Sequence, residues 1–126
     1  MWLSRILIGA VTAWNLQAAF AFFFWPENVT GAYELSGAAG AAAVRGVAVL
    51  FAMWSVPYLA ALWQPLRFRL ALTLAVLMQF IGLLGETFIL ATLPAEHAVL
   101  RGSILRFIAF DGAGLVLLAI AWAVGT

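Results

Sequence analysis

The chain has 126 residues, of which 67% are hydrophobic and only 9% are charged, and its net charge is +1. In a soluble domain about a quarter of the residues are charged. A small domain also leaves much of its surface exposed to water. This composition therefore argues against a soluble enzyme, a disordered chain and a nucleic-acid binder. The sequence contains no cysteine, which argues against a disulfide framework, a thiolate zinc site and a catalytic thiol.

Four stretches are long enough to cross a membrane, which takes about 20 mostly apolar residues in a helix. Pro26 follows the first stretch, Pro65 the second and Pro94 the third. The predicted spans cover residues 3–25, 38–63, 68–93 and 103–124. Irregular backbone is hard to accommodate in lipid. The sequence therefore predicts an all-α fold, in which residues 1–126 form one integral membrane domain, a four-transmembrane-helix antiparallel bundle with short loops.

The first span has an alternative interpretation. Arg5, the apolar run that follows it and the triplet Ala19-Phe20-Ala21 resemble a secretory signal peptide with a small-residue cleavage site. The apolar run continues past that triplet as far as Trp25. This length favours a retained membrane helix.

Charges in the connecting segments predict the orientation. The end that holds both termini carries Arg5, Arg67 and Arg69 and no acidic side chain. The opposite end holds Glu27, Glu34, Glu96, His97 and Arg101. Positively charged segments stay in the cytoplasm. We therefore expect both termini to be cytoplasmic.

The most informative residues are ionisable side chains inside the predicted spans. They come from three different spans, yet a rise of about 1.5 Å per residue places all of them in the outer half of the membrane. Charged groups in lipid are costly and usually pair inside a bundle. We therefore predict one buried cluster of arginines and carboxylates. Its members are Gln17, Arg45, Glu86, Arg106 and Asp111, with Glu34 above them.

Two interpretations of this cluster remain open. In the structural one, intramembrane salt bridges determine which helices pack together, because an unpaired charge would be destabilising. In the functional one, the cluster lines a pocket in which arginines hold an anionic or polar head group. Glu86 or Asp111 would then carry a proton.

A second polar set lies deeper. Trp14, Asn15 and Trp54 are near the predicted midplane, and Gln79 shares a helix face with Glu86 because seven residues separate them. A buried tryptophan needs a partner for its N–H, which Asn15 and Gln79 could supply. This set lines a cavity or belongs to the packed core.

The sequence predicts no metal site and no cofactor. His97 is the single histidine, and its place between Glu96 and Arg101 is typical of a solvated residue. No glycine-rich phosphate loop, metal-binding motif or nucleophile elbow is present.

Arg5 is followed by Ile8-Gly9, the chain has four predicted spans, and the second span has a polar first part at Ala43-Val44-Arg45-Gly46. In this layout the chain resembles the small DoxX-like families of bacterial membrane proteins. The resemblance covers the whole chain in hydropathy and few residues in motif. It implies a protein of the bacterial cytoplasmic membrane and assigns no functional residue; some relatives are linked to quinone-dependent redox chemistry.

Three functions follow as hypotheses. The first is binding of a hydrophobic or amphipathic small molecule, or a lipid, in an outer-half pocket. The second is a role as a non-catalytic accessory subunit of a larger membrane complex, such as a bioenergetic one. The third is a proton-coupled transporter or membrane enzyme that uses Glu86 and Asp111. The expected partners are the lipid bilayer, a hydrophobic small molecule, and further copies or a larger membrane complex.

Overall fold

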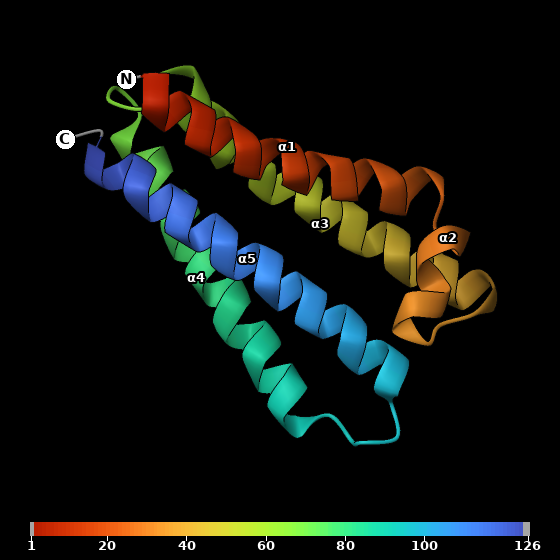
Figure 1. Ribbon diagram of the computed structural model, residues 1–126. Coiled ribbons are helices and arrows are strands. Elements are labelled where there is room, and N and C mark those ends of the chain that lie inside the picture. Colours follow the sequence, from red (N-terminus) through yellow and green to blue (C-terminus); the bar gives the residue numbers. More distant parts are fainter. Residues whose placement is uncertain (1, 125–126) are drawn as a thin grey trace.

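The computed structural model describes residues 2–124, and within them it is all-helical (Figure 1). Its elements are α1 (Trp2–Phe24), α2 (Glu27–Thr30), the 3-10 helix η1 (Gly31–Tyr33), α3 (Gly37–Trp63), α4 (Arg69–Thr92) and α5 (Ala98–Val124). Four of these helices are long and apolar enough to cross a membrane. The prediction of an all-α helical bundle is thus confirmed, although α5 begins five residues before the predicted start at 103.

Proline and polar residues end the long helices. Pro26, Pro65 and Pro94 each lie two residues beyond the end of a helix, where proline disfavours helical conformation in the residue before it. Within the helices every backbone polar group can be satisfied locally, which is the condition for a stable segment in lipid. Pro26, Pro65 and Pro94 therefore mark helix ends, whereas Pro57 lies inside α3.

Both termini lie at one end of the molecule, together with the connection between α3 and α4 (Figure 1). At this end arginines cap the last turns of neighbouring helices. Arg5 Nη2 donates to the carbonyl oxygen of Trp63 at 2.8 Å, and Arg69 Nη2 donates to that of Trp122 at 3.0 Å. The guanidinium of Arg69 also lies 4.3 Å from the Trp122 ring centroid. Cations at helix C-termini are favourable because the last carbonyls lack intrahelical partners.

The helices pack in two pairs, α1 with α3 and α4 with α5. Figure 1 shows these pairs close together near the termini and diverging toward α2. The packed core lies at the terminal end, where alanines allow close approach of the helices. It comprises Ile8, Val11, Tyr58, Ala61, Leu72, Ala75, Leu118 and Ala121.

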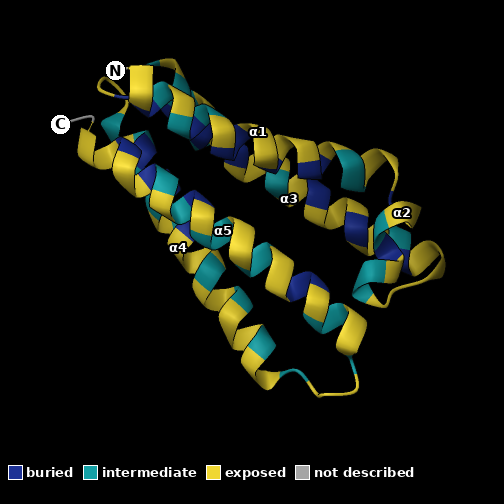
Figure 2. Ribbon diagram, in the orientation of Figure 1, coloured by how far each residue is buried: buried dark blue, intermediate teal, exposed yellow. Residues whose placement is uncertain are grey.

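The half of α4 that is farther from the termini does not belong to this core. Gln79 is the last buried residue of α4, so that the helix has none from residue 80 to Thr92 (Figure 2). Space therefore opens between the two helix pairs beyond Gln79, at the depth where the sequence places Glu86 and Asp111.

Candidate functional site

The structure does not form the predicted arginine–carboxylate cluster. Arg45 is exposed, and its Nε donates to the carbonyl oxygen of Phe23 at 3.0 Å. That carbonyl belongs to the last turn of α1, where the acceptors are unsatisfied and the helix dipole is negative. The long side chain of Arg45 thus reaches the end of a neighbouring helix, and not a carboxylate in the bundle.

Arg106 and Gln17 are also exposed. Arg106 Nη2 donates to Ser103 Oγ, one turn earlier on the same helix, at 3.1 Å. Among residues 2–124 the one ion pair joins Glu34 and His97. The predicted intramembrane salt bridge between Glu86 and Arg45 or Arg106 is therefore wrong for the described residues. Equal depth along helices does not imply a shared face, because each helix also has a rotation about its axis.

The two carboxyl groups do come together. Glu86 of α4 and Asp111 of α5 line the same cavity, and their side chains are neighbours. Glu86 Oε2 is buried and receives no hydrogen bond from a described donor. In an apolar surrounding, two neighbouring carboxyl groups such as this carboxyl pair favour a single shared proton, because two like charges at close range are unfavourable.

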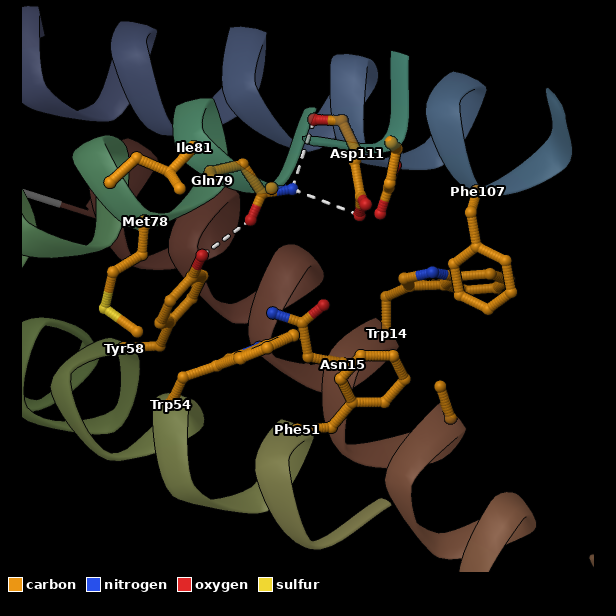
Figure 3. A pocket seen from close by; sticks show the side chains of 13 residues that line it. Trp14, Asn15, Phe51, Trp54, Tyr58, Met78, Gln79, Ile81, Phe107 and Asp111 are labelled. Atoms are coloured by element: carbon orange, nitrogen blue, oxygen red, sulfur yellow. Dashed lines mark hydrogen bonds between the residues drawn. The ribbon is translucent and has the colours of Figure 1, made fainter. Parts of the chain in front are cut away.

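A hydrogen-bonded chain crosses the bundle beside this pair (Figure 3). Tyr58 Oη of α3 donates to Gln79 Oε1 of α4 at 2.5 Å, and Gln79 Nε2 donates to the Asp111 carbonyl oxygen of α5 at 3.1 Å. Gln79 reaches α5 because position 114 is glycine: a Cβ there would lie 2.6 Å from Gln79 Nε2. The chain links three helices and fixes the position of Gln79.

The cavity that these groups line, hereafter the carboxyl cavity, has a volume of about 240 Å³. Its polar lining consists of Asn15, Tyr58, Gln79, Glu86 and Asp111. Asn15 is only 9% exposed and lies beside the Tyr58 hydroxyl, but its Nδ2 makes no hydrogen bond of ordinary geometry within residues 2–124. Buried amide donors are nearly always satisfied. An unpaired donor and an unpaired acceptor, Glu86 Oε2, therefore face one space.

Aromatic rings form much of the remaining wall (Figure 3). They are Trp14 of α1, Phe51 and Trp54 of α3, and Phe107 of α5. The Phe51 centroid lies 4.9 Å from that of Trp54 and 6.3 Å from that of Phe107. The secondary candidates Trp14, Asn15, Trp54 and Gln79 thus share one cavity.

A second, apolar cavity of about 380 Å³ adjoins the first. The two share Phe51, Glu86 and Phe107, and the apolar cavity extends toward Tyr33 and Leu35 near η1. The carboxyl cavity, which has a polar lining, therefore lies next to an apolar cavity.

Sequence reasoning missed Phe51, Tyr58 and Phe107. A signal for two of them was present, because residues 51, 54 and 58 recur at the helical spacing i, i+3, i+7 and are all aromatic. Phe107 stands alone between charged and apolar neighbours, and no comparable pattern marks it.

Glu34 is part of a separate contact at the α2 end. Its Oε1 lies 2.9 Å from His97 Nδ1, and its Oε2 accepts the Leu100 N–H at 3.0 Å. The hydrogen bond to His97 lowers the pKa of the Glu34 carboxyl, with a further contribution from the Leu100 N–H, and the same carboxylate raises the pKa of the His97 ring. Glu34 thus ties the segment after η1 to the start of α5 and does not join the carboxyl pair.

No family model, curated protein or solved structure matches this chain. The DoxX-like resemblance therefore stays a prediction. Within residues 2–124 no three His, Cys, Asp or Glu side chains gather in a way that could hold a metal ion.

Proposed function

We propose that the protein binds a small hydrophobic or amphipathic molecule, or a lipid, in the carboxyl cavity and the adjoining apolar cavity. The observation that supports this most is the pair of unsatisfied groups, Asn15 Nδ2 and Glu86 Oε2, in one aromatic-walled space. Unpaired buried polar groups cost free energy unless a ligand or ordered water satisfies them.

The composition of the walls supports the same proposal. Ligand sites are typically concave and mostly apolar, with a few converging polar groups. The carboxyl cavity of about 240 Å³ equals roughly the liquid volume of eight water molecules, which suits a head group. The apolar cavity of about 380 Å³ suits the body of the same molecule.

Native mass spectrometry of the gently solubilised protein tests the proposal, with two glycine variants of α4. Gly82 lines the carboxyl cavity and Gly85 does not, while an added Cβ meets no atom within 4 Å at either position. Gly82→Leu should fill the cavity and abolish a bound small-molecule mass, whereas Gly85→Leu should retain it.

Two outcomes would contradict the proposal. One is a wild-type protein without any bound small molecule or lipid at the site. The other is a bound mass that survives Gly82→Leu unchanged. A stoichiometric protein partner in place of a small molecule would support the accessory-subunit hypothesis instead.

We also propose that both termini lie in the cytoplasm of a bacterial cell. Arg5 and Arg69 stand at the terminal end, next to the rings of Trp2 and Trp122. Tryptophan is typical of both membrane interfaces, and an excess of arginine is typical of the cytoplasmic one. Acidic residues such as Glu34 lie at the other end.

A further inference from the structure

The charge of the carboxyl cavity restricts the ligand that it can hold. Glu86 and Asp111 both line it, and no arginine does. Arg45 is bonded to the end of α1, and Arg106 to Ser103. An anionic head group would therefore meet two carboxyl groups without any compensating cation, which is strongly unfavourable in a site of low dielectric.

Neighbouring elements do not supply the missing positive charge. Tyr58 of α3 and Tyr33 of η1 carry phenols, which are uncharged near neutral pH. The α1 lining consists of Trp14, Asn15 and an alanine, none of which ionises. Arg106 interacts electrostatically with Tyr33 but does not line the carboxyl cavity. Within residues 2–124, none of the helices around the carboxyl pair provides a counter-ion in the cavity.

The other walls favour a positive charge. The rings of Trp14, Phe51, Trp54 and Phe107 face the cavity, and aromatic faces attract ammonium groups within about 6 Å of a ring centroid. Figure 3 shows the Asn15 amide in the space between Trp54, Trp14 and Gln79. Because Asn15 is nine-tenths buried and its Nδ2 is unpaired, the cavity also offers a hydrogen bond that the protein itself does not use.

We propose that the ligand of the carboxyl cavity is an organic cation, an ammonium group on an apolar or aromatic body, and that it exchanges with the proton shared by Glu86 and Asp111. This inference rests on the proposed function and names the ligand class of the same site. The ammonium enters next to the carboxyl pair and the apolar body occupies the adjoining cavity.

The exchange conserves charge in the site. In the empty state one carboxyl group holds a proton that bonds it to the other. When the ammonium binds, that proton leaves to water, and the ligand supplies the N–H donors and the positive charge that the proton supplied before. One positive charge enters as one leaves, so that the cost of burying charge in the membrane stays nearly unchanged.

Three probes with the same body test this proposal: 4-phenylbutylamine, 4-phenylbutanol and 4-phenylbutyrate. They differ only in bearing a cationic, a neutral or an anionic head near neutral pH. Isothermal titration calorimetry on the full chain in detergent micelles, with empty micelles as the blank, measures their affinities between pH 6 and 9. At pH 8 the amine should bind about tenfold tighter than the alcohol. That preference should decrease as the pH falls, because protons then compete for the carboxyl pair.

Variants distinguish recognition of the amine by the carboxyl pair from a general effect of negative charge on the protein. Glu86→Gln, and independently Asp111→Asn, should lower the affinity for the amine far more than the affinity for the alcohol, so that the preference for the amine is lost. Glu96→Gln is the matched control, since Glu96 is exposed and does not line either cavity. Calorimetry in buffers of different ionisation enthalpy should report protons released on binding of the amine and none on binding of the alcohol.

The outcomes distinguish the two proposals. Equal binding of amine and alcohol without pH dependence would overturn the cation inference and leave the proposed binding function intact. Tighter binding of the butyrate would also overturn it. Binding of none of the probes, together with an empty site in native mass spectrometry, would overturn both. Retained amine preference in both carboxyl variants would show that the pair does not recognise the ligand.

Discussion

Replacing Tyr58 by phenylalanine should destabilise the bundle by about 1–2 kcal/mol. Tyr58 is 1% exposed, and its Oη donates to Gln79 Oε1 at 2.5 Å and contacts the Ala75 carbonyl oxygen at 3.3 Å. Loss of a buried partner costs about 1–3 kcal/mol in soluble proteins. Polar contacts between membrane helices average about 0.6 kcal/mol and reach about 1.7. Because Tyr58 is fully buried, we expect a loss of stability near the upper value for polar contacts between membrane helices, about 1.7 kcal/mol.

A double-mutant cycle with Gln79→Leu isolates the contact. Gln79→Leu alone should cost at least as much as Tyr58→Phe, because it leaves the Tyr58 hydroxyl with only the Ala75 carbonyl and removes the donor to Asp111. In the double variant both partners of the Tyr58–Gln79 bond are gone. Its loss should therefore be about 1 kcal/mol smaller than the sum of the single losses.

Equilibrium unfolding in mixed micelles with increasing dodecyl sulfate, followed by far-ultraviolet circular dichroism, measures these differences. Tyr33→Phe is the control, since no hydrogen bond of its hydroxyl is found among residues 2–124. A Tyr58→Phe loss no larger than that of Tyr33→Phe, or a coupling energy of zero, would refute the role of the chain that links α3, α4 and α5.

Gly114→Ala should destabilise the bundle by about 1–3 kcal/mol, because its Cβ would meet Gln79 Nε2 at 2.6 Å, whereas a Cβ at Gly112 meets nothing within 4 Å. Equal melting temperatures of Gly114→Ala and the control Gly112→Ala would contradict this packing. By NMR the ring of His97 should titrate above its ordinary pKa, and Glu34→Gln should return that pKa to the ordinary range; an unchanged value would disprove the ion pair. The stabilisation from this pair should be lost as pH rises through the raised pKa of His97, and also as pH falls through the lowered pKa of Glu34. A plot of Tm against pH without a plateau between these limits would contradict it. A C-terminal tag should react with an impermeant reagent only after the cells are opened, and labelling of intact cells would reverse the proposed orientation.

The candidate site was partly predictable from the sequence. The depth of Glu86 and Asp111 follows from residue counting, because each helical residue advances about 1.5 Å. Their charge in an apolar span marks them as interior groups, and the structure places both at one cavity. The spacing of Gln79 and Glu86 on one helix face was also informative.

Residue counting along the helices did not predict the contacts of the arginines. Arg45 and Arg106 have depths similar to that of Glu86, yet both side chains bond elsewhere. Arginine has a long side chain that can reach a helix end or an interface while its Cα stays in the span. A carboxylate has a shorter reach, so its location follows the backbone more closely than that of an arginine.

Composition and local pattern were enough to predict an integral membrane protein, its four apolar helices and their ends. Pro26, Pro65 and Pro94, with the polar residues beside them, interrupt apolar runs that are long enough to cross a membrane. The tertiary structure decided which side of each helix faces the others. The physical reason is that lipid chains are as apolar as a protein core, so hydrophobicity does not mark the buried face of a membrane helix. The rotation of each helix about its axis depends instead on close packing at individual residues, such as Gly114 against Gln79. This rotation determines which polar groups line the same cavity.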